Sequence, residues 1–159
     1  MIRIRPYKES DEQTILSWCA DEDTFHRWTA GVLGEYPITP EKVRKTGELM
    51  RFTALEETRV VGFFTVRNPR PTLDELRFGF VIVDPRMRGR GVGREMLRLG
   101  LAYAFRIYRA EKVSLGVFAD NESARRCYRA AGFRDTGALE TYCIRGVNRT
   151  AVEMECTAE

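Results

Sequence analysis

The sequence predicts one globular domain of mixed α/β class. Its 159 residues, 43% hydrophobic and 31% charged, are enough to form one buried core beneath a polar surface. Segments in which apolar and polar residues alternate, as in strands, are interspersed with segments of helical period. Because no repeat, linker or low-complexity tract interrupts this order, we expect a single domain over residues 1–159.

The N-terminal part is typical of a strand followed by short helices. Residues Ile2–Arg5 alternate apolar and charged side chains, and Pro6 closes the strand. Ser10 and Gln13 have the spacing of a capping box, which predicts the start of a first helix. A second short helix is expected around Phe25–Trp28.

A third helix and a hairpin come next. Thr39 followed by Pro40 is an N-cap signature with proline at the first helical position, and it predicts a polar helix that runs toward Leu49. Two runs rich in β-branched and aromatic residues, 51–55 and 60–67, are separated by a short polar turn. They predict a β-hairpin.

A strand predicted over residues 76–83 contains an irregularity. Alternation places four large apolar side chains on one predicted face, Leu76, Phe78, Phe80 and Ile82. Gly79 interrupts the other face of the strand. A glycine inside a strand often marks a bulge or the close approach of another backbone.

The second half alternates helices and strands. A long helix is predicted by an apolar stripe at helical spacing, made by Met96, Leu97, Gly100, Leu101, Ala104, Phe105 and Tyr108. A strand follows over 113–119, and Asn121 then caps a helix that Gly132 ends. Two terminal strands are expected near 133–144 and 149–156.

Charge and composition argue against several classes of function. The net charge of +3 comes from 26 basic and 23 acidic residues, a balance too even to indicate nucleic-acid binding. The four cysteines are isolated and His26 is the only histidine, so we expect no metal site and no disulfide framework. Isolated thiols are typical of a reducing cytoplasm. With no apolar run of membrane-spanning length, we expect a cytoplasmic protein that no segment exports or anchors in a membrane.

The segment Arg88-Gly89-Arg90-Gly91-Val92-Gly93 has the context of a phosphate-binding turn, between a predicted strand and the long helix. Glycines let backbone N–H groups approach an anion, the helix N-terminus adds free donors, and two arginines add charge. The segment lacks the Gly-Lys-Ser/Thr ending of a Walker loop and the glycine spacing of a dinucleotide fingerprint. Taken alone, it also has a plain alternative, a tight turn without a ligand.

Two motifs together resemble one enzyme family. Arg88 to Gly93 matches the pattern R/Q-x-x-G-x-G/A, and Asn121 to Phe133 matches N-x-x-A-x-x-x-Y-x-x-x-G-F. Both are signatures of the GNAT superfamily of N-acetyltransferases, which the chain resembles from end to end. Looser cues, among them Tyr103-Ala104-Phe105 and Trp28, resemble the RimJ/RimL type of ribosomal-protein N-terminal acetyltransferases.

The resemblance implies a splayed mixed sheet of six to seven strands flanked by about four helices. The strand that ends at Val83 would separate from the strand after Lys112 and leave a cleft for the pantetheine arm of acetyl-CoA. Val81 and Val83 would offer backbone groups to that arm. Asn121 would help to fix it, and Arg125 would reach an outer phosphate. The pyrophosphate would lie on the turn made by Arg88, Gly89, Arg90, Gly91, Val92 and Gly93.

Acetyl transfer needs a polarised carbonyl, a proton for the departing thiolate and a neutral amine. Backbone N–H groups near the Gly79–Val81 bend are candidates for stabilising the oxyanion. Tyr128 matches the family's tyrosine, and a phenol of ordinary pKa about 10 suits protonation of departing coenzyme A. Its alternative is a plain core residue, since it lies on the buried stripe of its helix. Glu75 is the candidate base, with a water chain as the alternative.

The predicted function is acetyl-CoA-dependent N-acetylation by direct attack in a ternary complex. An acyl-enzyme on Cys127 is less favoured, because the only histidine is far away in sequence. The RimJ/RimL likeness implies a protein N-terminal α-amine as acceptor. A small amine such as a polyamine, amino acid or antibiotic is the next choice. A non-catalytic acyl-CoA-binding module is the rival class of function.

Two further expectations concern the partners. A polyamine would need acidic groups in the acceptor cleft, and the cluster Asp21–Asp23 supplies candidates. The terminal hairpin, residues 142–156, would present an edge strand that is able to pair in a homodimer.

Overall fold

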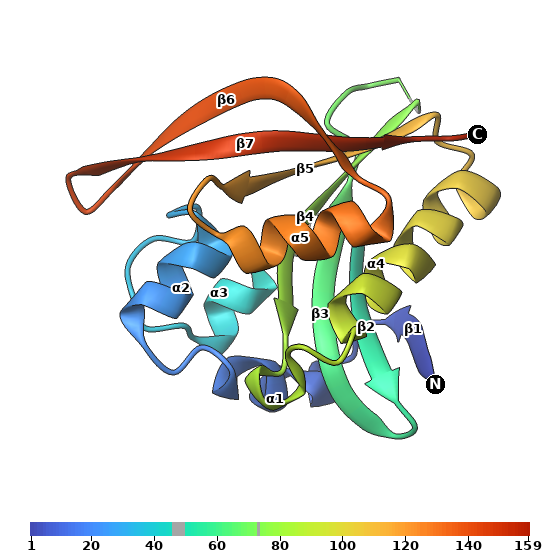
Figure 1. The fold of residues 1–159 in the computed structure, drawn as a ribbon. Helices are drawn as coiled ribbons and strands as arrows, with labels where there is room; N and C mark the ends of the chain where they lie inside the picture. The colour runs from blue at the N-terminus through green and yellow to red at the C-terminus, as the bar shows by residue number, and fades with distance from the viewer. Residues whose placement is uncertain (46–49, 73) are drawn as a thin grey trace.

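The computed structural model describes residues 1–45, 50–72 and 74–159, which form a seven-stranded sheet flanked by helices (Figure 1). The strand order is β1-β2-β3-β4-β5-β7-β6, and all neighbouring strands are antiparallel except β4 and β5. The mixed α/β class and the number of strands are confirmed. The strands are β1 (Ile2–Pro6), β2 (Met50–Glu56), β3 (Arg59–Arg67), β4 (Glu75–Val83), β5 (Lys112–Phe118), β6 (Arg134–Ile144) and β7 (Val147–Thr157).

Helices cover both faces of the sheet. The helices are α1 (Glu12–Ser17), α2 (Glu22–Thr29), α3 (Pro40–Arg44), α4 (Val92–Ala102) and α5 (Glu122–Ala131). Helices α4 and α5 lie across one face (Figure 1) and pack over Phe64 of β3, whereas α1 and α2 pack over its neighbour Phe63 on the opposite face. Within the described ranges, none of these helices has the length and apolarity that a membrane crossing needs.

The start of the first helix differs from the capping-box prediction. The chain makes a 3₁₀-helical turn over Glu9–Asp11, and α1 then begins without a side-chain cap from Ser10 or any other described residue. The buried Asp11 carboxylate instead binds the Arg5 guanidinium at 2.7 and 2.8 Å and accepts the Thr53 hydroxyl at 2.8 Å. An ion pair to β1 and a hydrogen bond from β2 therefore fix this segment, and a local sequence pattern does not reveal either contact.

The third helix and the long helix begin as predicted but end differently. The N-cap of α3 is confirmed, because Thr39 Oγ1 accepts the Lys42 N–H at 3.3 Å. This helix ends at Arg44, and the predicted continuation toward Leu49 falls on residues 46–49, outside the described residues. The long predicted helix divides into α4 and a π-helical turn at Tyr103–Ile107.

Strand β4 contains a bulge one residue beyond the predicted position. Thr65 of β3 is opposite Gly79, but Phe63 is opposite Ile82, so β4 has one extra residue between these pairs. Phe80 lies in this interval with a left-handed φ of 49°, which is rare for an aromatic residue.

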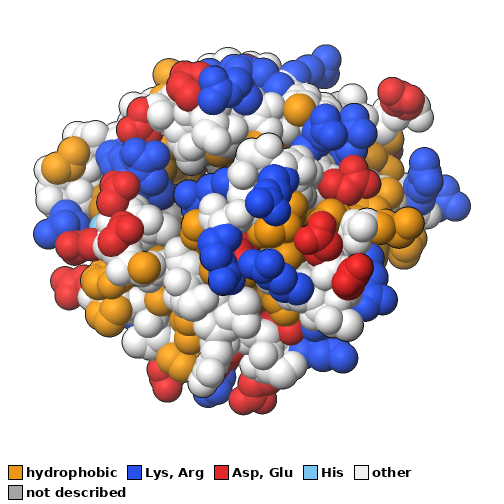
Figure 2. Space-filling model, turned by 60° about the horizontal axis from the view of Figure 1, so that its bottom comes forward, with side chains coloured by type: hydrophobic (Ala, Val, Ile, Leu, Met, Phe, Trp, Pro, Cys, Tyr) orange, Lys and Arg blue, Asp and Glu red, His pale blue; other side chains and the backbone are white. Residues whose placement is uncertain are grey.

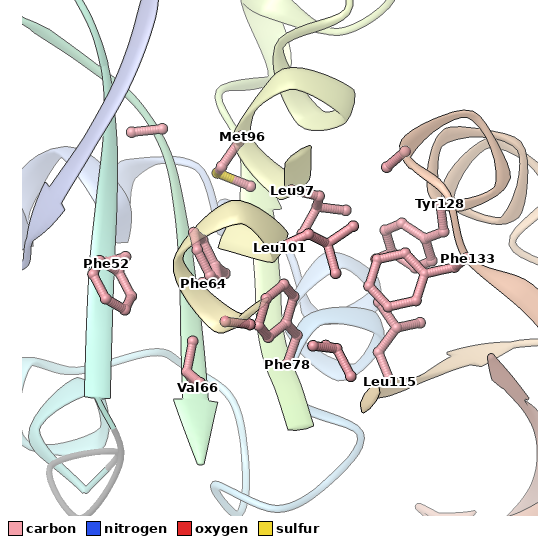
Figure 3. Close-up of a cluster of buried hydrophobic side chains, with 14 of the residues drawn as sticks. Phe52, Phe64, Val66, Phe78, Met96, Leu97, Leu101, Leu115, Tyr128 and Phe133 are labelled. Atoms are coloured by element: carbon pink, nitrogen blue, oxygen red, sulfur yellow. The ribbon is translucent and has the colours of Figure 1, made fainter. Parts of the chain in front are cut away.

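The bulge exchanges the faces to which the side chains of β4 point. Leu76 and Phe78, before the bulge, lie in the core beneath α4 and α5. Figure 3 shows Phe78 in this core, near Phe64 and Leu101. Phe80 and Ile82, after it, lie in the core beneath α1 and α2. The prediction that all four share one face was therefore wrong, because an extra residue reverses the alternation of side chains along a strand.

Candidate active site

A cleft opens where β4 and β5 separate. The two strands pair only over their first three residues, with Arg77 opposite Ser114 as the last pair. Beyond this pair β4 stays with β3 and β5 stays with β7, so the predicted divergence toward Val83 is present. A cavity of about 510 Å³ lies there, bordered by α2, β3, β4, β5, α5 and the β6–β7 pair. This volume is in the range of small-molecule sites, roughly 300–1,000 Å³.

The bulge of β4 forms one wall of the cleft. In the described sheet, Phe80 and Val81 have no register partner on β3 or β5. The Trp28 indole Nε1 donates a hydrogen bond of 2.7 Å to the Phe80 carbonyl and holds the bend in place. Phe80 and Val81 line the cavity. Val83 lies further along, against the first turn of α4, where a methyl group on Gly93 would come 3.4 Å from its Cγ2.

One buried carboxylate holds the loop that follows β4. Asp84 Oδ1 accepts the Arg86 N–H at 2.9 Å, and Oδ2 binds the guanidinium groups of Arg86 and Arg59 at 3.1 and 3.0 Å. Burial by itself would raise the pKa of Asp84, but the bonds from Arg86 and Arg59 outweigh it, and the pKa is lowered. An ionised carboxylate thus fixes the 3₁₀-helical turn Pro85–Met87, which leads into the predicted phosphate-binding turn.

The turn from Arg88 to Gly93 has a backbone suited to binding an anion. Gly89 and Gly91 have left-handed φ values of 77° and 79°, which other residues rarely adopt. Gly91 is the N-cap of α4, so the first N–H groups of this helix lack a side-chain cap among the described residues. Arg88 and Arg90 are exposed beside them, and neither forms an ion pair with any described residue. Figure 2, which brings the lower end of the molecule forward, shows Lys and Arg side chains near the centre of that face.

Asn121 and Arg125 lie at the start of α5. Asn121 borders the cleft, and its Oδ1 accepts the Ala124 N–H at 3.2 Å, which confirms the predicted cap. Arg125 points elsewhere: Nη1 donates to the Ala119 carbonyl at 3.0 Å, and Nη2 lies 3.7 Å from Asp135. Its two terminal nitrogens are thus engaged within the protein, whereas its buried Nε has no hydrogen-bond partner among the described residues. Contact with an outer phosphate stays a prediction.

Tyr128 on α5 borders the cleft and the core at the same time. Its residue surface is 8% exposed, and its ring packs edge to face on Phe133, with ring centroids 6.4 Å apart (Figure 3). Burial, and to a lesser degree Cys127, raises the pKa of the phenol, so the hydroxyl stays protonated at neutral pH. Tyr128 is thus a protonated phenol on a residue that borders the cleft, and its role as a general acid stays a prediction.

The neighbouring thiol lacks the features of a catalytic nucleophile. Burial raises the pKa of Cys127 against a weaker opposing effect of Arg94, so little thiolate is present at neutral pH. His26 is buried in α2, and across the described chain neither of its ring nitrogens has a hydrogen-bond partner. The described residues therefore contain no Cys–His pair.

Glu75 lies at the closed end of the two strands, where β4 and β5 are still paired. Its carboxylate is 3.3 Å from Arg70 Nε and 3.9 Å from Lys112 Nζ. These residues border a separate pocket of about 300 Å³, whose described lining does not include Tyr128. The structure therefore does not bring Glu75 and Tyr128 into one site.

The cleft is positively charged, which no sequence motif predicted. The described lining contains no Asp or Glu but includes four cations, Arg27, Lys45, Arg67 and Arg77. They come from α2, the end of α3, β3 and β4, so no local motif connects them. Only the pairing of strands and the packing of the helices bring them together.

The acidic cluster Asp21–Asp23 lies outside the cleft. Asp21 accepts the Thr24 N–H at 2.8 Å and caps α2. Glu22 Oε2 is 3.1 Å from Arg145, and Asp23 Oδ2 is 3.0 Å from Arg27. None of the three carboxylates is in the described lining of the cleft, although Asp23 pairs with Arg27, which is.

Comparison with known families agrees with this geometry. The model of the acetyltransferase (GNAT) family matches residues 8–133, a range that includes β4, β5, α4 and α5. The chain therefore belongs to the GNAT family of acetyltransferases. Its seven-stranded sheet, splayed between β4 and β5 and covered by helices on both faces, has the GNAT fold.

Individual relatives differ in their acceptors. The spermine/spermidine N(1)-acetyltransferase of Bacillus subtilis is 32% identical over 74 residues, 46% of this chain and 45% of the relative. The chain thus matches less than half the length of this curated relative. The structure of spermidine N-acetyltransferase from Vibrio cholerae in complex with CoA and spermine has a TM-score of 0.79 and 18% identity, over 98% of this chain and 95% of that one. A ribosomal-protein-alanine N-acetyltransferase from Brucella melitensis has a TM-score of 0.76 and 22% identity, over 98% and 99% of the two chains. Both structural matches show the fold alone.

Proposed function

We propose that this protein transfers the acetyl group of acetyl-CoA to a primary amine of a small molecule, by direct attack in a ternary complex. The observation that carries the proposal is the cleft between β4 and β5. It has the bulge at Phe80 in one wall and Tyr128 in another, and β4 leads from it to the turn at Arg88–Gly93.

The residues present fit the donor. The glycine turn and the N-terminus of α4 would hold the diphosphate, because they offer free N–H groups beside Arg88 and Arg90. The amide-bearing pantetheine arm would bind along the edge of β4 at Val81 and Val83, which β5 leaves open after Arg77.

In the reaction the amine attacks the thioester carbonyl, and coenzyme A leaves as the thiol. Backbone N–H groups at the Phe80–Val81 bulge would stabilise the negative charge that develops on the carbonyl oxygen. The Tyr128 hydroxyl, which its raised pKa keeps protonated, would donate a proton to the departing sulfur. Water would take the proton of the amine, since Glu75 lies in the separate pocket.

The comparisons support a small-molecule acceptor ahead of a protein N-terminus. Polyamine acetyltransferases recur among the curated matches, at 32% identity over 46% of this chain. The structural matches of both types, at 18% and 22% identity, carry the fold only. Polyamines are thus the acceptors that the names of the relatives suggest first, and the RimJ/RimL likeness is not a basis for the proposal.

Thiol release from acetyl-CoA tests this proposal. The assay would be run with polyamines, amino acids and α-amine peptides, and the products identified by mass spectrometry. We expect turnover with at least one small amine and formation of its N-acetylated product. Tight binding of acetyl-CoA without turnover of any amine would favour an acyl-CoA-binding module and would overturn the proposal.

A further inference from the structure

The charges of the cleft indicate the chemical class of the acceptor, given the acetyltransferase function proposed above. We infer that the acceptor amine also carries an anionic group, a carboxylate or a phosphoryl group, which binds Arg67 and Lys45.

Arg67 has a positive charge that no described residue neutralises. It is directly opposite Arg77 in the antiparallel register of β3 and β4, an arrangement of like charges that normally destabilises a strand pair. Arg77 is neutralised, because its guanidinium makes two hydrogen bonds of 2.8 Å to Glu153 and one of 3.3 Å to Ser114. Arg67 is exposed and forms no ion pair with the residues that the structure describes. One positive charge therefore stays uncompensated where the cleft begins.

Cations from the helical layer add to this charge. Lys45, directly after α3, lines the same cavity, is exposed and has no ion-pair partner in the described ranges. Arg27 of α2 also lines the cavity, and Asp23 holds it at 3.0 Å in an exposed pair of the kind that contributes little. Arg67 and Lys45 thus remain available to a ligand.

The carboxylates close to the cleft are already engaged. Glu153 is bound by both terminal nitrogens of Arg77, and Glu140 accepts the Tyr142 hydroxyl at 3.1 Å. Since the described lining contains no Asp or Glu, a polycation such as spermidine would meet positive charge and no carboxylate from the described residues of the lining. An amine that also carries an anion would meet two available cations.

The register also indicates the size of the acceptor. Arg67 follows Thr65 by two residues, and Thr65 is opposite Gly79 at the edge of the bulge. Two residues of an antiparallel strand span about 7 Å. The amine must reach the thioester at the bulge, so its anionic group lies a short distance away, which suits a molecule of amino-acid size.

Matched pairs of substrates test this inference. Values of kcat/KM would be measured for amino acids, for their uncharged carboxamides, for aminoalkylphosphonates and for spermidine. We expect the acid to exceed its amide by about tenfold, the usual effect of one charge-assisted hydrogen bond. Arg67→Glu should remove this preference for the acid. Arg98→Gln, on the exposed side of α4 and outside the cleft lining, should keep both the preference and the wild-type kcat.

A preference for phosphonates over carboxylates would support the inference and identify the anion. If spermidine is preferred to every anionic amine, or if Arg67→Glu leaves the acid-to-amide ratio unchanged, the inference fails and the acetyltransferase function stands. Turnover of no amine at all would contradict the proposed function, and the inference would fall with it.

Discussion

At the scale of single residues, the packing and the proposed chemistry of Tyr128 can be tested separately. Its ring contacts the core, and the residue also borders the cleft. Tyr128→Phe keeps the ring beside Phe133 and removes only the proton donor. We expect kcat to fall by about 100-fold or more, the usual contribution of a general acid, and the affinity for coenzyme A to change less than about twofold.

Steady-state thiol release and calorimetric titration with coenzyme A measure the two quantities. Tyr103→Phe is a matched control, since Tyr103 lies on the π-helical turn and does not line the described cleft. Equal turnover by wild type and Tyr128→Phe would leave Tyr128 as a core residue only.

Asp11 determines part of the pH dependence of stability. Burial by itself would raise the pKa of this carboxyl, but bonds from Arg5, Lys8 and Thr53 outweigh it, and the pKa is lowered in the folded state. A lowered folded pKa stabilises the protein above the unfolded value of about 3.9, and this stabilisation is lost as the pH falls through the folded pKa.

Asp11→Asn should therefore lower the free energy of unfolding at neutral pH by about 2–3 kcal/mol. It should also reduce the loss of stability that wild type shows below about pH 4. Urea denaturation at a series of pH values measures both effects. Parallel curves for the two proteins would show that Asp11 has the same pKa in the folded and unfolded chains.

At the scale of elements, α4 can approach the sheet because Gly100 has no side chain. A methyl group there would lie 2.9 Å from Phe64 Cζ and 3.0 Å from Phe78 Cε2, closer than packed atoms allow. Gly100→Ala should lower the free energy of unfolding by about 1–3 kcal/mol. Alanine favours a helix over glycine by about 1 kcal/mol, so this sign is the reverse of the one that helix propensity predicts.

Urea denaturation checks this prediction. Arg98→Ala, at an exposed position of the same helix, should change stability by no more than about 0.5 kcal/mol. A stabilising effect of Gly100→Ala would mean that α4 lies further from Phe64 and Phe78 than described.

The bulge of β4 depends on Trp28. Trp28→Phe removes the donor to the Phe80 carbonyl, so we expect a loss of about 1 kcal/mol of stability, and a fall in kcat as the bend loosens. Trp18 supplies the control, because its indole nitrogen is buried without a partner among the described residues. Trp18→Phe leaves a core cavity of the same kind without breaking a hydrogen bond, so it should lower stability but leave kcat unchanged. Steady-state kinetics and thermal melts measure kcat and stability for both variants. Equal changes in the two variants would contradict a special role of Trp28 in holding the bulge.

Elements were predicted best where the determining contacts are local. Alternation located β4 and β5, and the cap at Asn121 located α5. Gly79 indicated an irregularity, but the reversal of the faces of β4 needed the register with β3. Glu75 was placed in the cleft strand correctly, yet only the pairing of β4 with β5 shows that it lies at the closed end.

At the scale of the whole molecule, the sequence motifs predicted the family, which is confirmed. They also located the turn and the helix N-terminus proposed to bind the donor, because these two features are contiguous in sequence. The acceptor side is assembled from α2, the end of α3, β3 and β4. No sequence motif therefore marked Arg67 and Lys45 as residues of the site. Strand β6 is the outer edge of the sheet, and its pairing in a homodimer stays a prediction.

Backbone hydrogen exchange, measured with and without coenzyme A, tests the central claim most directly, that the divergence of β4 and β5 holds the donor. We expect slower exchange of the amides in residues 79–83 and 88–93, and no change in β1 at the far edge of the sheet. Protection that is absent from both segments, or that is confined to the pocket around Glu75 and Lys112, would contradict the claim.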